Sequence, residues 1–265
     1  MKSYEFVQVD RPQPEIAVVR LMREAKLNAL NAQLISDLAN AGEALRDDAR
    51  LKAIVITGGL RMFSAGADLS TFSDIQGMSS VSEVRRAIAK GGRMIDIWQS
   101  MPAITIAAVE GGAVGGGFGL SLACDWRVFA DNAWAYVPEV KLGLNYGWGT
   151  LPRLTALAGP AKAKWISVLC RRHSAKELQQ WNVVEQVCVA GQALPGALQL
   201  AKEVAELPAL AAQLVKKAVN AHSHALDHAA SHSDMEDMLV CMTDAEGSTA
   251  RQRIAQAVSG KGTSA

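Results

Sequence analysis

The sequence predicts an α/β fold that ends in a helical region at its C-terminus. Short apolar runs typical of buried strands alternate with helical periodicity through the first half of the chain. Two of these strands run into turns that are rich in glycine and other small residues. From Thr150 onward the pattern is almost wholly helical, and Pro160, Pro195 and Pro208 stand near the first turns of helices.

The elements of the first half follow from the spacing of apolar residues. Two apolar stretches flank Pro12 and Pro14, which predicts a hairpin near the N-terminus. Leu34, Leu38 and Leu45 recur on one face of a helix. The predicted strands of this half cover residues 4–9, 15–21, 52–57, 105–109 and 127–130, and its predicted helices cover residues 32–46 and 81–100.

The second half is predicted as a series of helices. They cover residues 151–158, 161–169, 175–181, 196–206, 209–221 and 226–242, and residues 258–265 are expected to be frayed. Trp148 is expected to pack the first of these helices onto the core. A chain of 265 residues is long enough to bury one large core, with at most a small extension.

Composition narrows the classes of function. A net charge of +1 gives no field for holding nucleic acid or a membrane surface, and no apolar run has the length of a membrane span. The four cysteines form no paired motif, so they are expected to be buried thiols in a reducing compartment. The first residues lack the apolar stretch of a signal peptide. We expect a cytoplasmic enzyme without nucleic-acid or membrane partners.

The most informative segment is an apolar strand followed by a glycine-rich turn and the start of a helix. Its glycines are Gly111, Gly112, Gly115, Gly116 and Gly117. Such a turn directs free backbone N–H groups at an anion, or at an oxygen that becomes negative during a reaction. A dinucleotide-binding fingerprint is excluded, because Leu120 stands where its last glycine should fall, and the chain has no P-loop motif.

A second turn of the same kind follows the strand predicted at residues 52–57. Gly58 and Gly59 come directly after that strand, and the small-residue sequence Ser-Ala-Gly-Ala-Asp follows at 64–68. Two such turns, each offering one backbone N–H, would hold one carbonyl oxygen from two sides. The sequence therefore predicts an oxyanion hole.

In these features the chain resembles the crotonase family, the enoyl-CoA hydratase/isomerase superfamily. The resemblance covers nearly the whole chain and is carried by motifs in the family's order and spacing, at residues 26–30, 54–58, 64–69, 107–117, 138–144, 151–155 and 175–178. It implies a crotonase-like spiral of ββα turns, expected over residues 1–200. A helical C-terminal trimerisation region is expected over residues 201–265.

The resemblance implies an acyl-CoA thioester as the substrate. The backbone N–H groups of Ala67 and Gly116 would form the oxyanion hole, and Glu139 would carry the proton. A single preorganised donor of this kind contributes about 10²–10³ in rate. No cofactor is expected beyond the CoA moiety of the substrate.

The resemblance also implies where the substrate would lie. Lys26 would approach the nucleotide end of CoA, and Ala65, Asp68 and Leu69 would line the adenine and pantetheine path. The acyl tail would be bordered by the segment of residues 71–90, which contains Phe72, Ile75 and Met78.

The chain departs from the family's hydratases at one position. Those enzymes use two glutamates, and Gly119 stands where the first of them would follow the glycine segment. A site with one acid more readily takes a proton from one carbon and returns it to another, as Δ3,Δ2-enoyl-CoA isomerases do. We therefore expect enoyl-CoA double-bond isomerisation, with Glu139 as the single proton shuttle and with its pKa raised by apolar surroundings.

Other functions stay open beside isomerisation. They are enoyl-CoA hydration with altered acid/base use, another crotonase-type reaction such as decarboxylation or hydrolysis, and acyl-CoA binding without catalysis. A dehalogenase-type aspartate nucleophile is not expected, because Asn145, Tyr146 and Gly147 follow Leu144. Asn145 or Tyr146 would instead orient a water or a carboxylate.

Two expectations concern the C-terminal region. His224, His228 and His232 are spaced to share one helix face, but no carboxylate or cysteine at matching spacing completes a metal site, so none is expected. The helices predicted at 209–221 and 226–242 carry more apolar surface than a thin spiral can cover. Together with this apolar surface, the resemblance to the crotonase family implies a homotrimer or a dimer of trimers.

Overall fold

The structure is a computed structural model that describes residues 3–68, 78 and 80–260. Its main sheet has the strand order β1-β2-β3-β5-β7-β10. β1 (Val7–Gln13) and β2 (Ile16–Leu21) form an antiparallel hairpin, and the remaining strands pair in parallel. The central strands β3 (Ala53–Thr57), β5 (Ile104–Val109) and β7 (Trp126–Ala130) are almost wholly buried, which explains their continuous apolar sequences.

A second, smaller sheet has the order β4-β6-β8-β9. β4 (Met62–Ser64), β6 (Gly112–Val114) and β8 (Trp134–Tyr136) are parallel, and β9 (Arg172–Ser174) is antiparallel to β8. The chain passes from β3 to β4, from β5 to β6 and from β7 to β8, so each pass adds one strand to each sheet. This repetition is the spiral that the sequence resemblance implied.

Helices cover the sheets. α7 (Ala193–Ala205) packs on β3, β5 and β7, while α1 (Ala32–Arg46) and α3 (Val81–Gln99) pack on each other. α4 (Gly116–Leu122) follows β6, and α6 (Ala175–Gln180) begins with a capping box. α5 (Thr150–Leu169) is kinked at Gly159, which has φ +73° and precedes Pro160. β10 (Gln186–Cys188) closes one edge of the main sheet.

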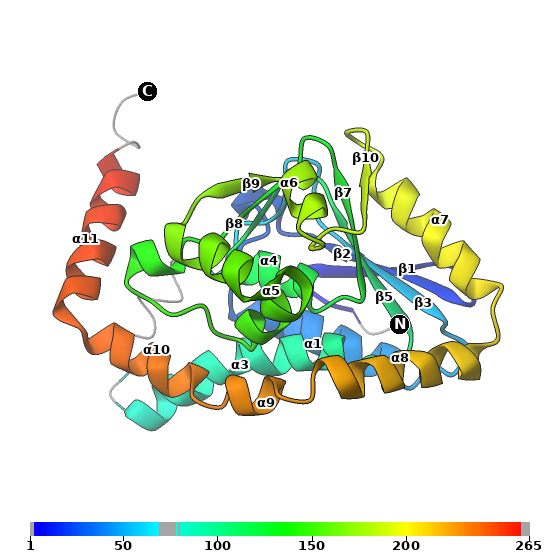
Figure 1. Ribbon diagram of the computed structural model, residues 1–265, viewed down its shortest axis with the longest axis horizontal. Coiled ribbons are helices and arrows are strands. Elements are labelled where there is room, and N and C mark those ends of the chain that lie inside the picture. The colour runs from blue at the N-terminus through cyan, green and yellow to red at the C-terminus, as the bar shows by residue number, and fades with distance from the viewer. Residues whose placement is uncertain (1–2, 69–77, 79, 261–265) are drawn as a thin grey trace.

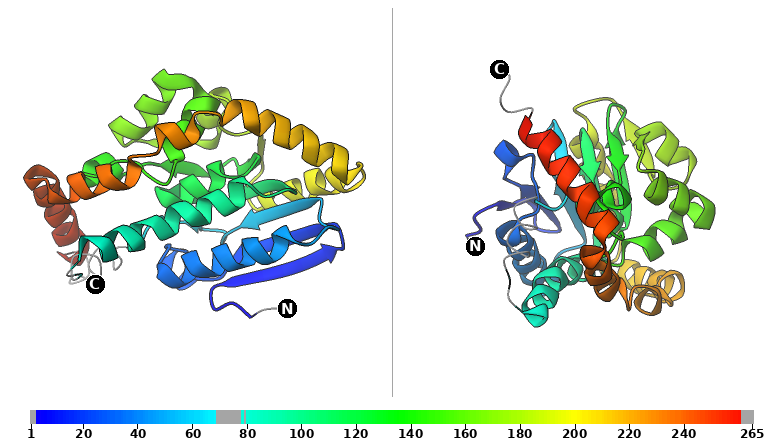
Figure 2. Two further views of the ribbon diagram at one scale, coloured as in Figure 1. Left: turned by 90° about the horizontal axis from the view of Figure 1, so that it is seen from below. Right: turned by 90° about the vertical axis from the view of Figure 1, so that its left-hand side faces the viewer.

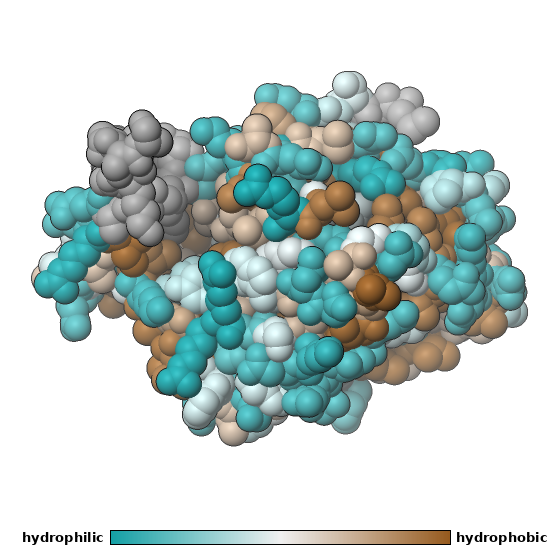
Figure 3. All heavy atoms as spheres, turned by 90° about the horizontal axis from the view of Figure 1, so that it is seen from above, coloured by the Kyte–Doolittle hydropathy of each residue, from teal (hydrophilic) through white to brown (hydrophobic). Residues whose placement is uncertain are grey.

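The C-terminal helices run along one edge of the molecule (Figures 1 and 2). α8 (Ala209–Ser223), α9 (Asp227–Ala230) and α10 (Asp234–Thr243) follow each other there, and α11 (Ala245–Gly260) turns away at the end. The buried Lys216 anchors α8, because its ammonium donates to Asp125 and to the Ala103 carbonyl. The face seen in Figure 3 lies opposite this edge, and hydrophilic residues there separate smaller hydrophobic groups.

The single helix predicted at 226–242 is wrong, because residues 231–233 interrupt it and divide it into α9 and α10. α8 ends at Ser223, and the Ser231 hydroxyl bonds the Asp227 carbonyl at the end of α9. His224 lies at the end of α8 and pairs with Asp227 at 2.7 Å, whereas His232 lies in the turn before α10. His224 and His232 therefore do not belong to one helix, whereas the predicted spacing had required a single helix.

Several other elements differ from the sequence prediction. The short strands β4, β6, β8, β9 and β10 were not predicted, because three residues are too few to show an alternating pattern. α11 was not predicted either. Residues 258–260 belong to it, whereas residues 261–265 lie outside the described part of the chain. The boundary proposed between residues 200 and 201 falls within α7 and stays a prediction. No helix among the described residues has the length and apolarity needed to span a bilayer.

Candidate active site

Three segments of the candidate site leave the smaller sheet at the same edge. β4, β6 and β8 are neighbouring parallel strands, so the residues that follow their carboxyl ends come together. Ala67 follows β4, Gly116 follows β6 and Glu139 follows β8. The fold therefore gathers the three residues that the sequence predicted for oxyanion binding and proton transfer.

The first two turns are in close contact. A Cβ atom built on Gly66 would lie 2.6 Å from the Val114 carbonyl oxygen and 3.4 Å from the Gly116 nitrogen. Gly66 also has φ +83° and Gly115 has φ +48°, a region that L side chains rarely adopt. Both glycines are thus required by their backbone conformation, and Gly66 is required also by the close approach of the Val114 backbone.

The backbone donors of this pair of turns are available. Within the described residues, neither the Ala67 N–H nor the Gly116 N–H donates a hydrogen bond. Gly116 is the first residue of α4, where helix geometry leaves N–H groups without an internal partner. The neighbouring bonds hold the turn, since the Leu30 N–H donates to Gly66 and the Asp68 N–H to Leu30.

Glu139 lies directly against the glycine turn. A Cβ on Gly115 would be 2.5 Å from Glu139 Oε1, and Glu139 Oε2 is buried with no hydrogen-bond partner among the described residues. Burial raises the pKa of Glu139 to about 8, opposed in part by its own backbone N–H. Glu139 begins a 3₁₀ turn, Glu139–Leu142, and the Leu144 N–H beyond this turn donates to the Glu139 carbonyl.

A cavity of about 420 Å³ opens onto these groups. Ala67, Gly116 and Glu139 line it, together with three of the residues predicted along the CoA path, Lys26, Ala65 and Asp68.

The side chains of that path differ in exposure. Asp68 forms an ion pair with Arg23 at 2.6 Å, and Lys26 is exposed at the end of a 3₁₀ turn, Glu24–Lys26. Leu69, Phe72 and Ile75 lie outside the described residues. The assignment of these positions to parts of CoA stays a prediction.

The side chains of Thr150 and Tyr146 limit the space beside Gly119. A Cβ there would lie 3.0 Å from Thr150 Oγ1 and 3.8 Å from the Tyr146 hydroxyl oxygen. The buried Tyr146 hydroxyl donates to the Gly115 carbonyl at 3.0 Å. Burial, and then the nearby Glu139 charge, raise the pKa of Tyr146, so the phenol stays a donor. Tyr146 therefore braces the glycine turn.

Trp148 was expected only to pack a helix, but it also lines the cavity. A Cβ on Gly116 would be 2.4 Å from its indole, and a Cβ on Gly91 of α3 would be 2.1 Å from it. Trp148 has φ +59°, and Gly149 beside it has φ +64°. The one sequence signal for this placement is the pair of glycines that flank Trp148, because they permit an unusual turn.

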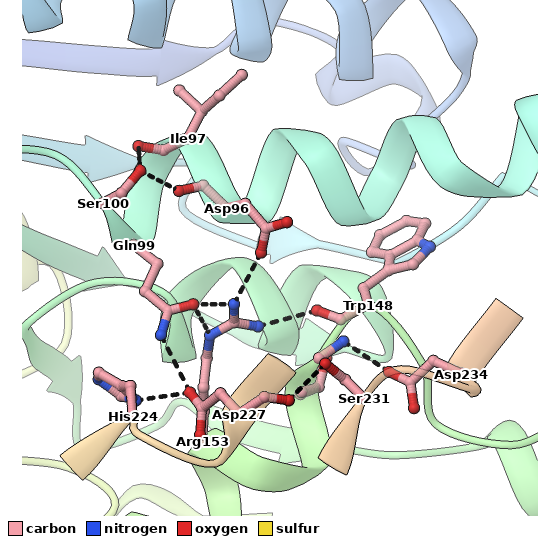
Figure 4. Close-up of polar contacts among 12 residues, drawn as sticks. Asp96, Ile97, Gln99, Ser100, Trp148, Arg153, His224, Asp227, Ser231 and Asp234 are labelled. Carbon is pink, nitrogen blue, oxygen red and sulfur yellow. Dashed lines mark hydrogen bonds and ion pairs between the residues drawn. The ribbon is translucent and has the colours of Figure 1, made fainter. Parts of the chain in front are cut away.

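A polar network outside the cavity holds this turn (Figure 4). Arg153 is almost wholly buried and donates to the Trp148 carbonyl at 2.9 Å, to Gln99 and to Asp96. From α10, Asp234 accepts the Gly149 N–H at 2.8 Å. α3, α5 and the C-terminal helices thus all position the segment that carries Trp148.

Comparison with known proteins agrees with this geometry. The family Enoyl-CoA hydratase/isomerase matches residues 11–253. A probable enoyl-CoA hydratase of Mycobacterium bovis is 35% identical over 221 residues, 82% of each chain. A crotonyl-CoA hydratase of Syntrophomonas wolfei is 32% identical over 219 residues, again 82% of each chain. A crystal structure of an enoyl-CoA hydratase from Bacillus anthracis superposes with a TM-score of 0.77 at 30% identity, covering 87% of this chain and 90% of that one.

The chain has the crotonase fold. It belongs to the enoyl-CoA hydratase/isomerase family and is an acyl-CoA enzyme of that family.

Proposed function

We propose that the protein isomerises enoyl-CoA double bonds, with Glu139 as the single proton shuttle beside a two-N–H oxyanion hole. The observation that carries this proposal is the composition of the cavity wall. Among the described lining residues the carboxylates are Glu139 and Asp68, and Asp68 is paired with Arg23. Glu139 is the carboxylate that faces the glycine turn, and Gly119 supplies no second acid.

The steps follow from these positions. The thioester oxygen accepts hydrogen bonds from the Ala67 and Gly116 N–H groups, which stabilises negative charge on that oxygen. Glu139 removes a proton from C2 of a 3-enoyl-CoA, and the electron pair is delocalised over the dienolate. The protonated Glu139 then delivers the proton to C4, and the double bond forms between C2 and C3. A carboxyl with its pKa near 8 accepts and releases this proton close to neutral pH.

An absorbance assay tests this function. Mixing the enzyme with a 3-enoyl-CoA should produce the absorbance of the conjugated 2-enoyl thioester, and heat-inactivated enzyme should not. Absence of that absorbance for a range of 3-enoyl-CoA chain lengths would refute isomerisation.

Hydration is the second candidate. The relatives described above are named as hydratases. Asn145 adds a feature of the site itself, because its Oδ1 is buried with no partner among the described residues while its amide donates to the Asp234 carbonyl at 2.9 Å. An acceptor fixed in this way in the cavity wall would help Glu139 to hold a water. Formation of 3-hydroxyacyl-CoA from a 2-enoyl-CoA, faster than isomerisation, would favour this function.

The placement of CoA is part of the proposal. Lys26 would meet a phosphate of the nucleotide, and the backbone near Ala65, Asp68 and Leu69 would follow the adenine and pantetheine. Lys26→Gln should therefore raise KM for an acyl-CoA and leave KM for the corresponding acyl-pantetheine unchanged. Equal effects on both substrates would contradict this placement.

A homotrimer or a dimer of trimers is proposed for the assembly. Leu210, Leu214, Val215 and Val219 on α8 are each more than half exposed. A helix face of this kind is covered in a closed symmetric oligomer. Light scattering should give three or six times the chain mass of 28.2 kDa, and a mass of one chain would refute the assembly.

A further inference from the structure

We propose that Trp148 determines which acyl groups the site accepts, by closing the cavity beside the thioester position so that short acyl groups fit and long ones do not. This inference rests on the proposed acyl-CoA function and names the substrate class within it.

The indole stands next to the reacting carbonyl. It contacts Gly116, whose N–H is one of the two oxyanion donors, and the 2.4 Å spacing to a built Cβ means that glycine alone fits there. On its other side it covers Gly91 of α3 with similar closeness. The ring therefore bridges the oxyanion turn and α3, and it leaves no passage between them for an acyl chain.

The wall is fixed in place. Trp148 adopts φ +59°, which is costly for a large side chain and persists only when its surroundings enforce it. The enforcement is visible in the hydrogen bonds from Arg153 to its carbonyl and from the Gly149 N–H to Asp234. Figure 4 shows the indole alongside α3, away from the polar groups that hold its backbone.

The space beside the indole is also filled. Thr150 and Tyr146 occupy the region next to Gly119, so the acyl group cannot turn that way. What remains of the 420 Å³ cavity must hold the thioester and the adjoining pantetheine as well as the acyl group. Among the described residues, much of its remaining lining is apolar and includes Ala87, Ile88, Leu144, Met238 and Met242. Short, uncharged acyl groups match this volume and lining.

Calorimetric titration of the full-length protein with butyryl-, hexanoyl-, octanoyl- and decanoyl-CoA tests the inference without requiring turnover. Wild type should bind butyryl-CoA about tenfold more tightly than decanoyl-CoA, a difference of about 1.4 kcal/mol, because forcing a long chain against a fixed wall is unfavourable. Trp148→Ala should remove this preference or reverse it. Trp148→Leu keeps an apolar side chain in place and should weaken the preference for short acyl groups only in part. This variant provides the test if the alanine variant does not fold.

A matched control is available on α5. Trp165 is about half exposed and lies outside the cavity lining, so Trp165→Ala should leave the ratio of affinities unchanged. Equal chain-length preferences in wild type and the folded Trp148 variants would overturn the inference, as would tight decanoyl-CoA binding by wild type. If wild type shows the chain-length preference in binding but does not isomerise a 3-enoyl-CoA, only the proposed reaction would be contradicted. Failure to bind any acyl-CoA would overturn both proposals.

Discussion

The two walls of the cavity differ in the groups that they present. One wall is backbone: the turns after β4 and β6 present N–H groups, and their glycines bring the two turns into contact. The other wall is made of side chains from residues 145–150, which Arg153 and Asp234 hold from outside. In the proposed mechanism the backbone wall meets only the carbonyl oxygen of the substrate, so it would suit any thioester. The side-chain wall would face the acyl group, which is the part of the substrate that varies, so we propose that selectivity resides there.

The largest expected effect comes from the carboxylate at the junction of the two walls. Glu139→Gln keeps the shape but cannot carry a proton, and loss of general acid–base catalysis lowers kcat by about 10²–10⁴. Steady-state kinetics and acyl-CoA titration should show this loss with binding nearly unchanged. The exposed Glu203 on α7 is the control, and Glu203→Gln should behave as wild type. Activity of Glu139→Gln within a few-fold of wild type would rule out Glu139 as the base.

Removing one donor from the backbone wall should have the next largest effect. Ala67→Pro deletes an N–H that forms no hydrogen bond within the described residues, so the bonds from Leu30 to Gly66 and from Asp68 to Leu30 are retained. We expect kcat to fall by about 10²–10³. Ala67→Gly keeps the N–H and should remain active. Equal activities of the two variants, both folded by circular dichroism, would show that this N–H does not meet the substrate oxygen.

The pH dependence of activity tests the burial of Glu139. The base must be ionised to take the first proton, and its pKa is raised to about 8. Therefore kcat/KM should rise with pH and level off above about pH 9. At about pH 6 it should be roughly a hundredfold below the plateau, because each unit below the pKa reduces the ionised fraction about tenfold. A profile flat down to about pH 5 would contradict this environment.

The raised pKa of Glu139 also predicts that stability falls as pH rises, whereas activity increases. The unfolded chain releases the Glu139 proton near the ordinary value of 4.5, whereas the native chain holds it up to about 8. Stability therefore falls as pH rises through this window and stays lower above it. Glu139→Gln should be more stable than wild type at about pH 8, by on the order of 4 kcal/mol, because the difference between the native pKa of about 8 and the unfolded value of 4.5 is almost fully expressed at that pH. Thermal melts of both proteins that coincide at this pH would contradict the expected stabilisation.

The smallest expected effect concerns the acid that is missing at Gly119. Glu at this position alone should fit poorly, because Thr150 Oγ1 lies 3.0 Å from the built Cβ. Combined with Thr150→Ala, Gly119→Glu should raise the ratio of hydration to isomerisation by about tenfold, through a second proton-transfer group. Thr150→Ala alone is the control. An unchanged product ratio in the folded double variant would contradict our interpretation of this departure from the hydratases.

The backbone wall could be predicted from the sequence, whereas the side-chain wall could not. Gly66, Gly115 and Gly116 can be predicted from strand and turn patterns, and the resemblance to the crotonase family indicated Glu139. Trp148 depends on contacts with α3, α5 and α10, which lie far apart in the sequence. The helix predicted at 226–242 is wrong for a related reason. Hydrogen bonds of Ser231 and Ser233 lie at the boundary between α9 and α10, and the spacing of apolar residues gives no sign of them.

The fate of a single hydrogen tests the central claim most directly. A 3-enoyl-CoA with deuterium at C2 is converted in ordinary water, and the product is analysed by mass spectrometry and NMR. If Glu139 alone shuttles the proton beside the oxyanion hole, the 2-enoyl-CoA should carry part of the deuterium at C4. A 3-hydroxyacyl-CoA as the main product, or a 2-enoyl-CoA with no deuterium at C4, would contradict a one-carboxylate isomerase.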